Sequence, residues 1–207
     1  CWNWHAPENQ GRGGGEAGMI AALTRHVITL CNGNRTRVYI AGISAGGAMA
    51  AIVGAAYPDL FVAVGVHSGV PRGDIRSLRA ALAAMQGKAG AMPTARLPRQ
   101  LPTIVFHGDQ DKVVHPSNAG GFLHNLERAG MGPLTLRSLP GKSDGGRDFS
   151  RRVYQDRLGT VLLEDWTIHG SGHSWSGGNP MASHTDPAGP DASREMLRFF
   201  LARRRHS

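Results

Sequence analysis

A serine framed by glycines is the feature that most constrains the fold of this chain. The run Gly42-Ile43-Ser44-Ala45-Gly46 lies between residues 37–41, which contain Val, Tyr and Ile, and residues 47–57, which are mostly small and apolar. The first segment predicts a strand and the second predicts a helix. A strand that turns directly into a helix needs glycines at the crossing and holds the serine in strained backbone geometry. The sequence therefore predicts a nucleophile elbow that exposes the Ser44 hydroxyl.

The main alternative for this run is the glycine-rich loop of a nucleotide-binding fold. No lysine follows the run as a phosphate-binding loop requires, and no acidic ribose ligand is evident about 20 residues further on. We therefore favour serine chemistry. The N–H of Ala45, at the start of the helix, is then the expected donor to an oxyanion.

A nucleophilic serine needs a base, and the base needs an orienting acid. In folds with such an elbow these residues follow in the chain order Ser, Asp, His. Residues 101–107 predict a buried strand, a loop with Asp109 and Asp111 follows, and a helix is expected from about Ser117 to Ala129. Asp111 is our first choice for the acid and Asp109 the alternative, because the residues themselves do not separate two acids so close together.

The expected base lies in a later loop. Residues 161–168 alternate as a strand, and residues 169–175 follow as a glycine-rich loop. His173 lies there between flexible backbone and Trp175, which suits an imidazole that moves protons between a serine and a leaving group. His169, at the strand end, is expected to be structural.

A metal site is the rival explanation for these histidines and acids. His169 and His173 are separated by Gly-Ser-Gly rather than carried by a helix, and the chain has no His-Glu-x-x-His motif. We therefore expect neither a catalytic metal nor another cofactor.

Several segments together resemble the polyhydroxybutyrate-depolymerase-type esterases. The segments that carry the resemblance are residues 1–4, residues 37–61, Val66-His67-Ser68-Gly69, His107-Gly108-Asp109-Gln110-Asp111, residues 172–178, residues 185–187 and residues 191–193. The resemblance implies an α/β-hydrolase fold and ester hydrolysis by Ser44, His173 and Asp111. It favours Asp111 over Asp109, because the family's acid ends a His-Gly-x-x-Asp pattern.

The same resemblance implies a range of substrates. Polyesters or oligomers of 3-hydroxyalkanoates come first, with feruloyl or acetyl esters of plant polysaccharides as the alternative. A noncatalytic polymer-binding shell is the alternative from another class. Trp175 is the first candidate to line the substrate cleft, with Trp2 and Trp4 as weaker candidates. A secreted or periplasmic location also follows from the resemblance alone.

Composition sets wider limits. The chain has 207 residues, enough for one domain, and a net charge of +8 that comes mostly from scattered arginines. No aromatic-interleaved basic motif accompanies that charge, so we expect no nucleic-acid partner. No apolar run reaches transmembrane length, and no signal peptide is evident. The sequence leaves open whether Cys1 forms a disulfide with Cys31 or with a cysteine outside this chain.

The remaining elements leave a deficit of strands. We expect a helix over residues 16–30 with Ile20, Leu23, Val27 and Leu30 on one face, short strands over 134–139 and 152–155, and a last helix capped by Asp191 or Ser193. Residues 74–99 predict a helix and a connection. Only four strong core strands are evident, whereas the implied fold has about eight. We therefore expect a single domain that is incomplete at its N-terminus, with an uncovered sheet edge at residues 37–41 or another polypeptide segment filling it.

Overall fold

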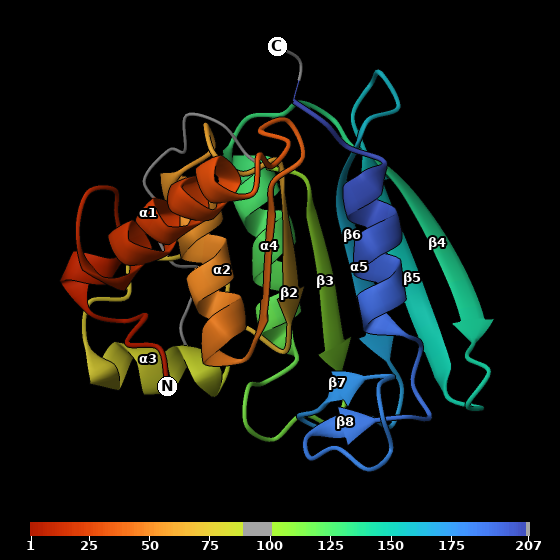
Figure 1. Cartoon of the computed structure of the whole chain (residues 1–207). Coiled ribbons are helices and arrows are strands. Elements are labelled where there is room, and N and C mark those ends of the chain that lie inside the picture. The colour runs from red at the N-terminus through yellow and green to blue at the C-terminus, as the bar shows by residue number, and fades with distance from the viewer. Residues whose placement is uncertain (89–100, 206–207) are drawn as a thin grey trace.

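The computed structural model describes residues 1–88 and 101–205. Its centre is a six-stranded mixed sheet with the order β1-β2-β3-β6-β5-β4 (Figure 1). The four parallel strands are β1 (Tyr39–Ile43), β2 (Ala63–His67), β3 (Thr103–Gly108) and β6 (Val161–Ile168). The antiparallel strands β5 (Asp148–Gln155) and β4 (Thr135–Lys142) extend the sheet beyond β6. A mostly parallel sheet with helices on both faces is the α/β architecture that the resemblance implies.

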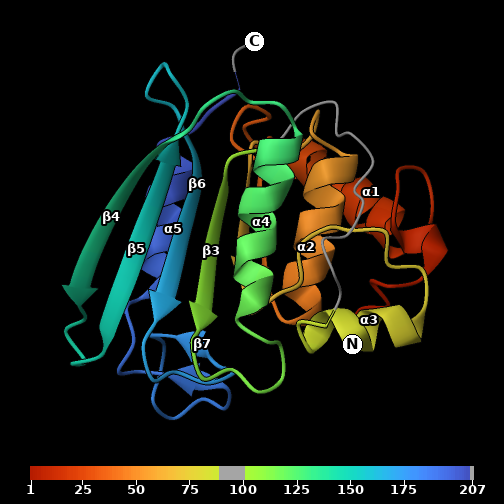
Figure 2. The ribbon, with the colours of Figure 1, turned by 180° about the vertical axis from the view of Figure 1, so that it is seen from behind.

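Helices cover both faces of the sheet. The longer helices are α1 (Gly15–Leu30), α2 (Ala45–Ala56), α3 (Leu78–Met85), α4 (Ser117–Arg128) and α5 (Ala192–Leu201). Side chains alternate across each strand, so in β3 Val105 joins the core under α2 and α4, whereas Ile104 and Phe106 join the core under α5. The view from behind shows α2 and α4 in front of the sheet and α5 beyond it (Figure 2).

The parallel register aligns the carboxyl ends of the strands at one edge of the sheet. Ile43 pairs with His67, His67 pairs with Phe106, and Gly108 pairs with Ile168. The loops that carry Ser44, Asp111 and His173 therefore leave the sheet at the same edge, where ligands bind in open α/β sheets. A small ribbon of β7 (Trp175–Ser176) and β8 (Thr185–Asp186) closes this edge near the last loop (Figure 1).

Most elements lie close to their predicted bounds. The strand predicted over residues 161–168 has these bounds in β6, and α5 begins after Asp191, whose side chain accepts from the N–H of Arg194. β1 begins and ends two residues later than expected, because residues 42 and 43 remain paired with β2. The two short strands predicted around a glycine-rich loop are longer and form one hairpin, with Gly141 inside β4.

The apolar face expected on α1 is not its core face. The helix packs against α2 and its neighbours through Ala17, Ala21 and Ile28, whereas Leu23 and Val27 are 61% and 46% exposed. β1 beside it is the end strand of the sheet and pairs only with β2 among the described residues. Whether another segment fills this edge stays a prediction.

The helix expected in residues 74–99 is α3, and residues 89–99 lie outside the described part of the chain. Cys1 and Cys31 are exposed and carry free thiols.

None of the described helices combines the length and the apolar character needed to cross a membrane.

Candidate active site

Ser44 occupies a sharp turn between β1 and the first turn of α2. Its φ of 56° and ψ of −124° lie in a strained region that non-glycine residues rarely adopt. A Cβ on Gly42 would lie 2.3 Å from the carbonyl oxygen of Gly46, so the chain crosses itself too closely for a larger residue. The Ser44 N–H donates to the carbonyl oxygen of His67 at 2.9 Å and ties the turn to β2. The strand–turn–helix expected around Ser44 is thus present.

The helix that follows Ser44 presents a free donor. Ala45 is the first residue of α2, and its N–H has no hydrogen-bond partner among the described residues. The N-terminus of a helix carries unpaired N–H groups and partial positive charge, which stabilise a negative oxygen placed there. The Ala45 N–H therefore lies where the sequence predicts an oxyanion donor.

Asp111 is a buried carboxylate that contacts its own loop and two histidines, His107 and His173. Its Oδ1 accepts from the N–H groups of Val113 and Val114 at 2.9 Å each, and its Oδ2 accepts from Nδ1 of His173 at 2.7 Å. Burial alone would raise the pKa of Asp111, but hydrogen bonds from His107, His173 and the two N–H groups outweigh it and hold the pKa well below its usual range. The carboxylate is therefore ionised beside His173, and it stabilises an imidazolium there.

The loops that carry Asp111 and His173 are fastened to each other. The Asp109 N–H donates to the carbonyl oxygen of Ile168 at 3.1 Å, and the Gln110 N–H donates to the carbonyl oxygen of Ser171 at 2.9 Å. The ionised Asp111 carboxylate accepts a hydrogen bond from Nδ1–H of His173, so Nε2 is the ring nitrogen with a free lone pair. That assignment makes Nε2 available as a base.

His67 connects the Ser44 turn to the loop that carries His173. The hydrogen bonds of residues 1–88 and 101–205 do not include one between the Ser44 hydroxyl and His173. His67, whose carbonyl oxygen holds the Ser44 N–H, also accepts from the N–H of Ser176 on its ring Nε2 at 2.9 Å. The elbow and the histidine loop are therefore neighbours. Hydrogen bonds between nucleophile and base are often long without substrate and tighten when it binds.

Asp109 contacts a different histidine. Its Oδ2 lies 3.0 Å from Nδ1 of His169, and its Oδ1 accepts from the Gly170 N–H at 2.8 Å. Nε2 of His169 lies 2.9 Å from the Ser150 hydroxyl on β5. The structure thus places Asp111, rather than Asp109, against His173, and it gives His169 the structural surroundings expected of it.

Gly108, the last residue of β3, lies close to the backbone of the loop that carries His173. A Cβ there would lie 2.3 Å from the carbonyl oxygen of Ser171 and 2.6 Å from that of Gly172. We expect Gly108→Ala to push the loops apart, to lower kcat by about 100-fold or more and to cost about 1–3 kcal/mol of stability. Gly120→Ala in α4 is the control, because no atom lies within 4 Å of its Cβ position. Equal kcat for both variants, measured with a short p-nitrophenyl ester, would contradict this account.

Two hollows open beside Ser44. One has a volume of about 220 Å³ and is lined mostly by apolar side chains of α3 and of the N-terminal segment, together with His5; the described residues in its lining include no Asp, Glu, Lys or Arg. The other is a groove of about 530 Å³ that follows the free edge of β1. Trp2 lines both hollows and Trp4 lines the first, whereas Trp175 lines neither. Trp175 instead stacks on the His67 ring and donates to the Ser193 hydroxyl at 3.1 Å. The weaker tryptophan candidates therefore suit a substrate better than the first one.

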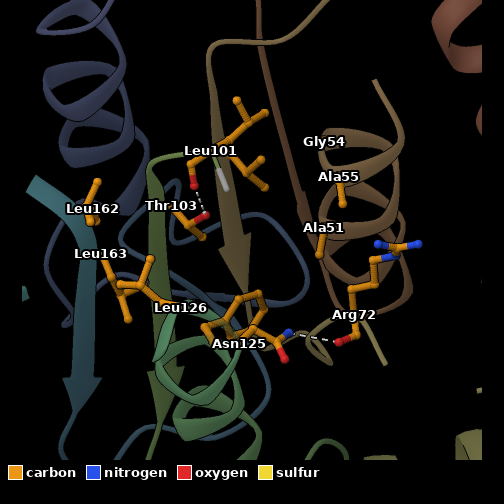
Figure 3. Close-up of a pocket in the computed structure, with 12 residues that line it drawn as sticks. Ala51, Gly54, Ala55, Arg72, Leu101, Thr103, Asn125, Leu126, Leu162 and Leu163 are labelled. Atoms are coloured by element: carbon orange, nitrogen blue, oxygen red, sulfur yellow. Dashed lines mark hydrogen bonds between the residues drawn. The ribbon is translucent and has the colours of Figure 1, made fainter. Parts of the chain in front are cut away.

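A further cavity lies away from this edge, between α2, α4 and the sheet (Figure 3). Its volume is about 50 Å³, it shares no lining residue with the hollows at Ser44, and Asn125 at its rim donates to the carbonyl oxygen of Arg72 at 2.8 Å. Such a volume holds a few water molecules. It is too small for a polymer or an aromatic ester.

Two histidines of the site have no role in the sequence prediction. His67 and His107 lie at or near the ends of apolar strands, and both are buried. Nε2 of His107 lies 2.8 Å from the carbonyl oxygen of Val114 and 3.5 Å from Oδ2 of Asp111. The sequence signal for such a residue is a histidine at or near the end of an otherwise apolar strand. A polar side chain in that position is buried only where it has hydrogen-bond partners.

No group of three or more His, Cys, Asp or Glu side chains in the described part of the chain is arranged to hold a metal ion. The chemistry that the site supports directly is that of its own hydroxyl, imidazole and carboxylate.

The sheet, the elbow and the order Ser, Asp, His define an α/β-hydrolase fold. A family model, described as esterase PHB depolymerase, matches residues 1–130. The chain belongs to this family.

Individual relatives agree with that assignment. A poly(3-hydroxyalkanoate) depolymerase C of Paucimonas lemoignei is 30% identical over 184 residues, covering 84% of this chain and 44% of the relative. A feruloyl esterase B of Thermothelomyces thermophilus is 31% identical over 193 residues, covering 84% of this chain and 63% of the relative. This chain therefore spans less than two thirds of either relative. The structure of an acetyl xylan esterase from Aspergillus awamori shares the fold with a TM-score of 0.68 at 21% identity, covering 84% of this chain and 68% of that one.

Proposed function

We propose that this chain carries the nucleophile, base and acid of a serine carboxylic-ester hydrolase. The observation that carries the proposal is the buried Asp111 carboxylate bonded at 2.7 Å to His173, on the same sheet edge as the strained Ser44 turn. A strained backbone turn close to a buried carboxylate that is hydrogen-bonded to a histidine is typical of catalytic sites.

The reaction proceeds by two acyl transfers. Ser44 Oγ attacks the ester carbonyl carbon as its proton passes to Nε2 of His173, and Asp111 stabilises the imidazolium. The Ala45 N–H binds the oxyanion, a contribution of about 3 kcal/mol for such a donor. The alcohol leaves with the proton from His173. A water molecule then attacks the acyl carbon as it gives a proton to His173, and His173 passes that proton to Ser44 Oγ as the bond to the acyl group breaks and the acid leaves.

The substrate we propose is a 3-hydroxyalkanoate polyester or its oligomers. The mostly apolar hollow of about 220 Å³ beside Ser44 supports a neutral ester, because the described residues that line it include no Asp, Glu, Lys or Arg to pair with a charged group. The depolymerase among the relatives supports the polyester, and the feruloyl esterase supports the aromatic alternative. An acetylxylan substrate is the third option.

We also propose a secreted or periplasmic location, which the similarity to the depolymerase and esterase relatives supports.

Labelling with a fluorophosphonate tests the reaction class. The serine oxygen attacks the phosphorus of such a probe and displaces fluoride to form a phosphonate ester, so we expect covalent modification at Ser44 that Ser44→Ala abolishes. A noncatalytic shell that only binds polymer surfaces would remain unlabelled while still adsorbing to polyester particles. That result would overturn the esterase proposal.

Substrate choice needs a direct comparison. We expect a higher kcat/KM for 3-hydroxybutyrate oligomers than for methyl ferulate or acetylated xylan. A preference for the ferulate would make the aromatic ester the substrate class and leave the mechanism unchanged.

We also propose that another extended polypeptide segment pairs with the free edge of β1. The edge strand leaves N–H and C=O groups unpaired, and the exposed side chains of Leu23 and Val27 on α1 lie on the same side of the fold as the groove along β1 that Ile20 lines. An N-terminal segment or a neighbouring chain would bond to these N–H and C=O groups and cover these exposed side chains. Such a segment would also be able to supply a second N–H to the oxyanion.

A further inference from the structure

His67 lies between the two halves of the candidate site. It is the last residue of β2 and is fully buried. Its carbonyl oxygen accepts from the Ser44 N–H at 2.9 Å, and its ring Nε2 accepts from the Ser176 N–H at 2.9 Å. One residue therefore contacts the nucleophile turn through its backbone and the histidine loop through its side chain.

The ring of His67 is fixed in orientation. It stacks on Trp175, with 5.1 Å between ring centroids, and on Phe106 at 5.8 Å. Its Nδ1 lies 3.0 Å from the hydroxyl of Ser68, a residue with the left-handed φ of 47°. Strained backbone beside a site is a reason to look for a role. Here the strain aims the Ser68 hydroxyl at the ring.

The ring is also fixed in its protonation state. A backbone N–H is always a donor, so Nε2 must be the unprotonated nitrogen and Nδ1–H must donate to Ser68. Burial, with the positive charges that His107 and His173 can carry, lowers the pKa of His67 to about 3. The acceptor at Nε2 is therefore present throughout the neutral range.

The far side of the histidine loop is anchored as well. The buried Ser176 hydroxyl donates to the carbonyl oxygen of Pro190 at 2.7 Å, so Ser176 is held between the segment before α5 and the His67 ring. Ser176 follows His173 by three residues. Its position therefore limits where the His173 ring lies relative to Ser44.

We propose that His67 is a positioning residue that sets the distance between the Ser44 hydroxyl and Nε2 of His173. This inference rests on the proposed serine mechanism. Asp111 orients the His173 ring but is not linked to Ser44, whereas His67 is bonded to both loops. A change of about 1 Å in this distance costs on the order of 100-fold in rate.

The test compares two replacements of His67 in the full chain. His67→Phe keeps an aromatic ring for Trp175 but removes the acceptor for Ser176, and we expect kcat to fall by about 10- to 100-fold with KM changed less than about threefold. His67→Gln places an amide oxygen near the original Nε2, and we expect it to recover most of kcat. Phe199→Leu in the core under α5 is the control for lost stability alone, with kcat unchanged.

A second readout separates positioning from general damage. The proton shared by His173 and Asp111 should give a low-field NMR signal, and we expect His67→Phe to retain it while kcat falls. An unchanged kcat in His67→Phe, or equal losses in the Phe and Gln variants, would overturn the inference. If His67→Phe does not fold, His67→Met carries the same test. Absence of both activity and fluorophosphonate labelling in the unmodified protein would instead refute the esterase proposal itself.

Discussion

Ser44→Ala is expected to lower kcat for short p-nitrophenyl esters by about six orders of magnitude, the largest effect of any single change in the chain. In the proposed mechanism the hydroxyl oxygen of Ser44 forms the acyl-enzyme, and neither His173 nor Asp111 replaces it. Alanine keeps the Cβ and the same backbone preferences, so the free energy of unfolding should change by less than about 0.5 kcal/mol. Steady-state kinetics and thermal unfolding measure the two quantities separately.

A serine elsewhere provides the control. Ser138 is exposed on β4, far along the sheet from β1, so Ser138→Ala should leave kcat unchanged. Residual activity of Ser44→Ala above about one part in a thousand, free of contaminating enzyme, would show that another group is the nucleophile.

Asp111→Asn is expected to lower kcat by about 10,000-fold. The N–H groups of Val113 and Val114 both point at Oδ1, so the amide must place its oxygen there and its NH₂ toward His173. Nδ1 of His173 then becomes an acceptor, and the proton moves to Nε2. The imidazole is left in the tautomer that cannot take a proton from Ser44.

Asp109→Asn makes this prediction specific. Asp109 bonds to His169 and Gly170 rather than to His173, so its amide variant should lose less than about tenfold in kcat. Equal losses in the two variants would mean that the carboxylates act through the rigidity of the loops, and the tautomer argument would then be wrong.

The sequence predicts the local parts of the site well. The Ser44 turn depends on glycines and on a strand next to a helix, which are features of adjacent residues. Asp111 is the first choice from the residues without a physical reason to exclude Asp109, and the family resemblance supports that order. The contact with His173 spans 62 positions, so only the folded chain reveals it. His67 was missed for the same reason, since its partners Ser44 and Ser176 are far from it in the chain.

The face of α1 shows a different limit. Helical periodicity correctly marks Leu23 and Val27 as one apolar stripe, but the helix buries Ala17 and Ala21 because small residues allow close approach to α2. Periodicity predicts which residues share a side of a helix. It does not predict which of two neighbouring apolar sides meets the core.

The position of β1 at the sheet edge has a consequence for how the site fails under stress. Within residues 1–88 and 101–205, Ser44 follows a strand with a single neighbour, whereas the Asp111 and His173 loops follow the strands β3 and β6, which are paired on both sides. Local opening of an edge strand costs less free energy than global unfolding. Mild denaturant should therefore disorder the nucleophile while the rest of the sheet is intact, so that activity disappears in an earlier transition than the far-ultraviolet circular dichroism signal. A segment paired with β1 would merge the two transitions into one, and the distance between the two midpoints would report how completely that edge is occupied.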